Sequence, residues 1–91
     1  MTGSVKKNMF NTATQLTSSD NLNSLTTNGL FYCLDGNDPV GLPEQAGHWL
    51  IMNLAYGRGG AQIAFMTYST RQMWVRIRHW DSYTAWTKMI G

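Results

Sequence analysis

Apolar and polar residues alternate with a period of two through much of the second half of this 91-residue chain. Such alternation places successive side chains on opposite faces of a β-strand. The run 72–80 shows it best: one side carries Met73, Val75 and Ile77, and the other carries Trp74, Arg76, Arg78 and Trp80. This part of the chain therefore predicts a β-sheet.

Five runs of this kind are rich in aromatic and β-branched residues and are separated by turn-forming segments. They predict strands at 29–35, 48–55, 61–69, 72–80 and 84–89. The glycine-rich segment 56–60 is typical of a hairpin turn, because glycine readily adopts positive φ. The fold class that follows is mainly β: a small antiparallel sheet of four to five strands.

The N-terminal part, up to about residue 28, is rich in Thr, Ser and Asn and holds few apolar residues. Such a composition buries too little surface to fold alone. We therefore expect 1–18 to be a flexible segment or linker, and 19–91 to form the β domain. Leu22 and Leu25 follow possible N-capping residues at i, i+3 spacing, which predicts one short helical turn over 20–26 that packs both leucines on the sheet.

The chain carries little charge: its formal net charge is +2 and only 13% of its residues are charged, against an average of about 25%. A weakly charged surface favours contact with another chain. The single cysteine, Cys33, excludes a disulfide scaffold and fits synthesis in a reducing cytoplasm. The longest apolar run, 49–52, is far too short to span a membrane, and we expect no membrane insertion and no signal peptide.

Two arginines alternate with tryptophans in the run 74–80, and this pattern has two interpretations. Aromatic platforms among cations suit single-stranded nucleic acid. Arginines that cover tryptophan faces also form cation–π contacts within a sheet. We favour the second interpretation, a structural aromatic and cation cluster without a nucleic-acid partner, made of Trp74, Arg76, Arg78, Trp80 and Trp86.

Other candidate chemistry is weaker. The loop 36–47 and its flank offer Asp35, Asp38 and Glu44, but their spacing does not match an EF-hand, so we expect a solvated loop and no metal. Cys33 and His48 lack the sequence context of a catalytic nucleophile and base, which predicts no enzyme and no cofactor. Gly57–Gly60 lacks the Lys-Ser/Thr ending of a phosphate loop and is interpreted as a turn.

The order of these segments resembles the pyocin-knob family, small domains of phage tail fibres and R-type pyocin fibres. The resemblance covers about residues 20–90. It rests on Leu22 and Leu25, on Gly29 with Phe31 and Tyr32, on Gly47 with Trp49 and Leu50, on Gln62 with Ala64 and Phe65, on Trp74-Val75-Arg76-Ile77-Arg78, and on Trp80 and Trp86 with Thr87 and Lys88. One departure is that Tyr83, rather than a tryptophan, stands three positions before Trp86.

This resemblance implies a non-enzymatic distal knob module of a phage or phage-derived tail fibre, which contributes to attachment to the host cell surface. It also implies a homotrimer, a virion tail-fibre location after synthesis in the host cytoplasm, and a bacterial surface glycan such as lipopolysaccharide as a possible ligand.

Aromatic rings stack on the apolar faces of sugars, so exposed aromatics near turns are the natural candidates for glycan binding. The ligand-binding candidates are Trp49, Tyr56, Arg58 and Tyr68. Two alternatives stay open: a structural spacer domain of the fibre with the receptor site elsewhere, and a small single-strand nucleic-acid-binding β domain.

Overall fold

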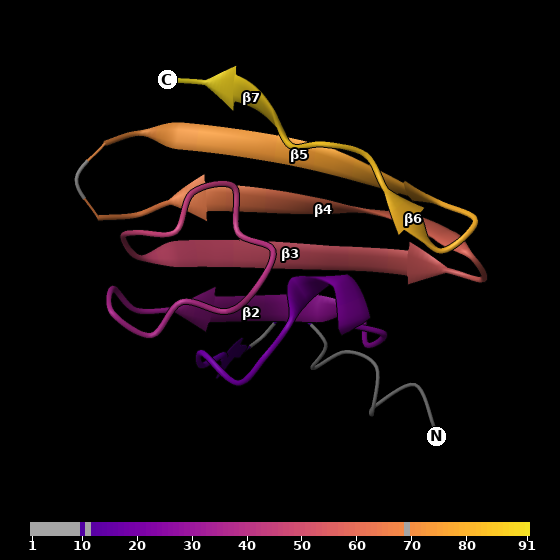
Figure 1. Cartoon of the computed structure of the whole chain (residues 1–91), viewed down its shortest axis with the longest axis horizontal. Coiled ribbons are helices and arrows are strands. Elements are labelled where there is room, and N and C mark those ends of the chain that lie inside the picture. The colour runs from indigo at the N-terminus through magenta and orange to yellow at the C-terminus, as the bar shows by residue number, and fades with distance from the viewer. Residues whose placement is uncertain (1–9, 11, 69) are drawn as a thin grey trace.

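The computed structural model describes residues 10, 12–68 and 70–91, which form one sheet of seven strands and one 3₁₀ turn (Figure 1). The mainly β prediction is confirmed. The elements in chain order are β1 (Ala13–Gln15), η1 (Leu22–Ser24), β2 (Gly29–Cys33), β3 (Trp49–Tyr56), β4 (Gly59–Met66), β5 (Gln72–His79), β6 (Ser82–Tyr83) and β7 (Thr87–Ile90).

Strands β2, β3, β4 and β5 form the predicted antiparallel meander. Short strands complete the sheet at its edges. On one edge, β1 pairs with β2 in parallel. On the other, β6 and β7 pair with different parts of β5. The predicted fifth strand, 84–89, is thus replaced by two short strands, and Trp86 lies between them.

The prediction that residues 1–18 form a flexible linker is wrong for its described C-terminal part. Residues 13–15 pair with β2, and the backbone N–H of Leu16 donates to the carbonyl of Tyr32 at 2.7 Å. The Leu16 side chain is buried in the core. The domain therefore begins by Ala13; residues 1–9 and 11 lie outside the described residues.

One face of the sheet, which we call the covered face, lies under η1 and the loop between β2 and β3 (Figure 1). As predicted, Leu22 of the helical turn is fully buried and Leu25 packs against the core. The loop is not simply solvated, because it buries Pro39 and Leu42. The buried apolar residues are Leu16, Leu22, Phe31, Cys33, Leu42, Trp49, Ile51 and Ala64.

A row of buried polar side chains crosses the covered face beside this core. Gln62 donates through Nε2 to the Leu22 carbonyl at 2.8 Å and to Asn53 Oδ1 at 3.0 Å. Its Oε1 accepts from Arg76 Nε at 2.9 Å and from Arg76 Nη2 at 2.7 Å. Because an unpaired buried polar group is costly, these bonds fix η1 and β3 to β5 in one arrangement.

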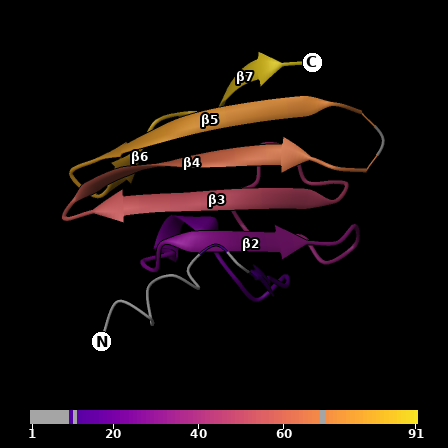
Figure 2. The same cartoon turned by 180° about the vertical axis from the view of Figure 1, so that it is seen from behind.

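The opposite face, which we call the open face, is seen in Figure 2, where no described segment crosses strands β2 to β5. The register aligns its side chains across the strands: Leu30, Met52, Ile63 and Val75 form one row, and Tyr32, Leu50, Phe65 and Met73 the next. Strand β3 is therefore apolar on both faces, as its sequence indicates, yet described residues cover only one of them.

Candidate ligand-binding site at the hairpin tips

Two hairpin turns lie side by side at one end of the sheet. The β3–β4 turn is Gly57-Arg58, and the β5–β6 turn is Trp80-Asp81. They meet because Gly59, which begins β4, pairs with His79, which ends β5. The backbone N–H of Asp81 donates to the Arg58 carbonyl at 3.2 Å, so the two tips are also linked directly.

The first turn has the geometry that its sequence predicts. It contains two residues, because Tyr56 pairs with Gly59 across it. Gly57 adopts a φ of 46°, and a positive φ at the first central position is typical of a type II′ turn. Strand β4 therefore begins at Gly59, two residues before the predicted start of the third strand.

The second turn has unusual residues for its geometry. Trp80 and Asp81 have φ values of 52° and 66°. Positive φ at both central positions defines a type I′ turn, which strongly favours Asn-Gly. A tryptophan in the left-handed region is a rare and strained choice. The turn holds the Trp80 side chain out from the sheet, where it is 64% exposed.

Asp81 links two arginines from neighbouring strands and turns. Its Oδ2 accepts from Arg58 Nε at 2.8 Å and pairs with Arg58 Nη2 at 2.6 Å. Its Oδ1 pairs with Arg78 Nη2 at 2.7 Å. The hydrogen bond from Arg58 is the main cause that holds the pKa of the Asp81 carboxyl below its usual range. The carboxylate thereby fixes Arg58, whose guanidinium lies 5.1 Å from the centroid of the Trp80 ring.

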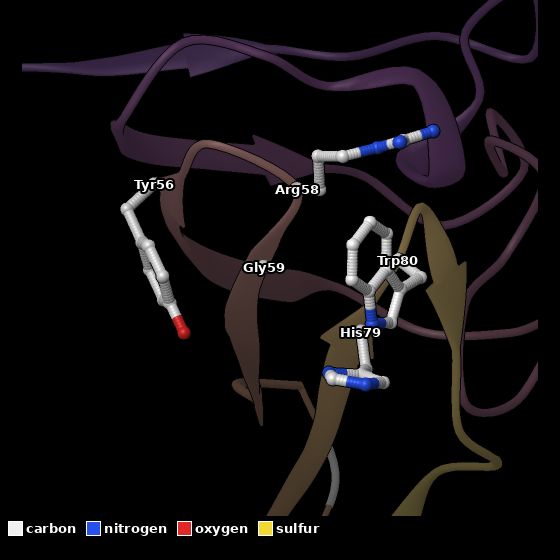
Figure 3. Close-up of a pocket in the computed structure, with 5 residues that line it drawn as sticks. All are labelled: Tyr56, Arg58, Gly59, His79 and Trp80. Atoms are coloured by element: carbon white, nitrogen blue, oxygen red, sulfur yellow. The ribbon is translucent and has the colours of Figure 1, made fainter.

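These tips enclose a shallow hollow of about 220 Å³ lined by Tyr56, Arg58, Gly59, His79 and Trp80 (Figure 3). Tyr56 lies on one side of Gly59, and His79 and Trp80 lie on the other. A Cβ at position 59 would come within 2.9 Å of the Tyr56 ring. Glycine is therefore needed for Tyr56 to lie across this strand and form one wall.

The hollow combines exposed aromatic walls with polar groups that are held in place. Tyr56 is 77% exposed, and His79 packs edge to face on Trp80 at 6.0 Å between ring centroids. Aromatic faces with a few oriented donors and acceptors suit a ligand that has both an apolar face and hydroxyl groups. Among the described residues, no group of three His, Cys, Asp or Glu side chains is placed to hold a metal ion.

Two of the four predicted ligand-binding residues, Tyr56 and Arg58, meet in this hollow. The expectation for Trp49 is wrong: its side chain is 1% exposed, and its Nε1 donates to the Ala46 carbonyl at 2.8 Å inside the covered face. Tyr68 is exposed, but it follows β4 at the opposite end of the sheet and packs on His48 at 4.5 Å. Tyr68 and Tyr56 therefore do not form one site.

Sequence reasoning missed the contribution of the second turn. Trp80 was assigned to the structural cluster because it continues the alternation of β5, but the strand ends at His79 and the ring is exposed. Arg78 likewise pairs with Asp81 rather than with a tryptophan. Asp81 is a common turn former, but the two-residue turn places it second, so Trp80 before it is already outside the strand.

Of the remaining members of the predicted structural cluster, Arg76 and Trp86 pack together. Arg76 is 6% exposed and lies between two rings, 4.0 Å from the Tyr83 centroid and 4.7 Å from the Trp86 centroid. Trp86 Nε1 donates to the Gly41 carbonyl at 2.8 Å, and Trp74 lies under Lys88. Since Arg76 is enclosed, one of the two cations on which the nucleic-acid alternative depends is not free to reach a phosphate.

The weak catalytic alternative finds no support in the geometry around Cys33. Cys33 is fully buried, and this burial raises the pKa of its thiol. His48 Nδ1 instead accepts a hydrogen bond from the backbone N–H of Asp35 at 2.8 Å. The Asp35 carboxylate accepts from the Gly47 N–H at 3.0 Å, so both side chains close the loop rather than activate a thiol.

No family model, no curated protein and no solved structure matches this chain. In the described part of the chain, no helix has the length and apolar character needed to cross a membrane.

Proposed function

We propose that this chain is a non-enzymatic knob module of a phage or phage-derived tail fibre, and that its hairpin-tip hollow binds a glycan of the bacterial surface. The observation that carries the proposal is the pair of exposed rings, Tyr56 and Trp80, which flank a hollow at the end of the sheet. Large aromatic side chains exposed on a rigid turn are typical of recognition surfaces.

The geometry suits a sugar better than a fully apolar or a strongly charged ligand. The rings offer faces on which the C–H groups of a sugar can stack. Arg58 and His79, which line the hollow, offer hydrogen-bonding atoms for hydroxyls. Asp81 offsets one of the two positive charges of Arg58 and Arg78, so this end of the sheet is polar and keeps only a small net positive charge. Its groups are also held before binding, which lowers the entropic cost of association.

The fibre setting is proposed from the resemblance to the pyocin-knob family. It would place the chain in a homotrimer within the tail fibre of a virion, after synthesis in the host cytoplasm. The hollow lies at a loop end of the sheet, a position that leaves turns free to contact a surface.

The test is binding of the full chain to a panel of bacterial lipopolysaccharides and surface glycans. We expect Trp80→Ala and Tyr56→Ala each to weaken binding by at least about 10-fold, since each removes a stacking ring. Tyr68→Ala is the matched control, because Tyr68 is an equally simple exposed aromatic at the opposite end of the sheet. Circular dichroism checks that each variant is folded.

Two outcomes would contradict the proposal. Binding that falls with Tyr68→Ala but not with Tyr56→Ala and Trp80→Ala would place the receptor site elsewhere on the domain. A folded chain that binds no member of a broad panel would favour the spacer alternative, in which another domain of the fibre recognises the host.

A further inference from the structure

The open face of the sheet is mainly apolar and carries no Asp, Glu, Lys or Arg at its paired positions. The paired registers of β2 to β5 place fourteen positions on it. They are Leu30, Tyr32, Leu50, Met52, Leu54, Tyr56, Gly59, Ala61, Ile63, Phe65, Met73, Val75, Ile77 and His79. Antiparallel sheets usually present a polar face to water when only the other face is packed.

Within the described part of the chain, no segment lies across this face (Figure 2). Ile77 is 48% exposed and Leu54 is 36% exposed. Two hollows mark its ends: one of about 450 Å³ beside Leu54 and Ile77, and one of about 270 Å³ beside Phe65, Met73 and Ile90. The face is thus uneven and accessible, with room for side chains of a partner.

The size of the open face is compatible with one side of a small protein interface. Three eight-residue strands and one five-residue strand, at a rise of about 3.3 Å per residue and a spacing of about 4.8 Å, give roughly 450 Å² in projection. Side-chain relief raises the accessible area above this value, towards the ~800 Å² that each partner contributes to a standard interface. A single apolar patch of this scale is as large as the largest patches of ordinary monomers, which are often functional.

We infer that copies of this chain pack against one another through their open faces. The absence of charge argues for an occupant that is itself apolar and neutral, since a charged partner would leave its charges unpaired on burial. Other copies of the chain supply such a surface by symmetry, and apolar sheet faces bury one another with interdigitated side chains. A sugar cannot fill this role, because the open face offers few hydrogen-bonding groups.

The open face adjoins the hairpin-tip hollow. Tyr56 and His79 line both that hollow and the larger hollow beside Leu54 and Ile77. Association through the open face would therefore place each hairpin-tip site at the rim of the interface, next to the neighbouring copy. The inference shares with the proposed function only the expectation of a homo-oligomer, and it stands independently of glycan binding.

Sedimentation and light scattering of the full chain over a wide concentration range test the inference without any glycan. We expect a homo-oligomer whose melting temperature rises with protein concentration. Ile63→Lys, at the centre of the face, and Ile77→Lys, near its end, are expected to raise the apparent dissociation constant by at least about 100-fold. Ile77 is already half exposed, so a lysine there can reach water in the folded monomer.

Val40→Lys is the matched control. Val40 is 54% exposed in the loop over the covered face, so the same kind of substitution there should leave the oligomer intact. A chain that stays monomeric at its highest soluble concentration would overturn the inference, and so would a folded Ile77→Lys variant that associates like the wild type. A monomer that associates only after removal of residues 1–9 would assign the face to that segment and would overturn it too.

Discussion

The molecule contains two clusters of an arginine with a tryptophan, and they differ in almost everything except their residue types. Arg76 lies 4.7 Å from the Trp86 ring on the covered face and is 6% exposed. Arg58 lies 5.1 Å from the Trp80 ring at the hairpin tips, and its side chain is 64% exposed. The first cluster is part of the packing, and the second forms part of a candidate site.

The difference comes from the partners that hold each guanidinium. Among the described residues, Arg76 has no carboxylate partner; Gln62 Oε1 accepts two of its N–H groups, and two aromatic rings cover its faces. Burial lowers its pKa to about 10, which still leaves it charged at neutral pH. Arg58 is held instead by the exposed carboxylate of Asp81. Residue type alone therefore does not decide whether an Arg–Trp pair stabilises the fold or contacts a ligand.

The largest change in stability is expected when the buried arginine, Arg76, is replaced. Arg76→Met removes both donors to Gln62 Oε1 and leaves that oxygen buried without a partner, which we expect to lower the free energy of unfolding by about 2–3 kcal/mol. Arg58→Met should leave stability nearly unchanged, because exposed ion pairs contribute little. Urea denaturation of both variants measures the contrast. Equal losses of stability in the two variants would show that the clusters are not different in kind.

Much of the sheet was predictable from the sequence because alternation and turn residues are local signals. Strands β3 and β5 match their predicted ranges to within one residue at each end. Strand β1 was missed because its residues are polar and its parallel pairing joins segments seventeen positions apart. Parallel pairing of distant segments leaves no periodic pattern in the chain.

The candidate site was harder to predict, because exposure depends on what lies over each face. Strand β3 is apolar on both sides, so its sequence does not tell that Trp49 is buried while Leu54 is not. Trp80 was misassigned by a single residue, since β5 ends at His79. One position separates a side chain in the sheet from one in a turn, and strand ends are the least certain part of such predictions.

The strained turn at Trp80 and Asp81 allows stability and glycan binding to be changed in opposite directions. Asparagine tolerates positive φ far better than tryptophan and is favoured in type I′ turns, so Trp80→Asn is expected to stabilise the fold by about 1 kcal/mol. The same substitution should abolish stacking and weaken glycan binding. Trp80→Phe is the control, since it keeps both the ring and the strain. Thermal unfolding and glycan binding are measured on the same preparations; a Trp80→Asn variant that is less stable than the wild type would contradict the strain account.

The smallest expected effect is a change of folding stability at acid pH. It should differ between the two clusters, because a carboxylate holds Arg58 and an amide oxygen holds Arg76. The pKa of Asp81 is lowered below its usual value of 3.8, mainly by the hydrogen bond from Arg58. A lowered folded-state pKa gives stability that is fully present above 3.8 and is lost as the pH falls through the folded value. The difference in stability between wild type and Asp81→Asn should therefore be constant near neutral pH and shrink below 3.8.

The effect of Arg76→Met should show no such decline over the same acid range, because the amide oxygen of Gln62, which does not titrate, holds Arg76. Urea titrations at a series of pH values measure both differences, and the contributions of the other carboxylates cancel within each pair of proteins. The stability difference caused by Arg76→Met could instead shrink below pH 3.8 as much as that caused by Asp81→Asn. Such a result would mean that a carboxylate also supports the buried cluster. The difference between Arg58 and Arg76 could then not be explained by the partners that hold them.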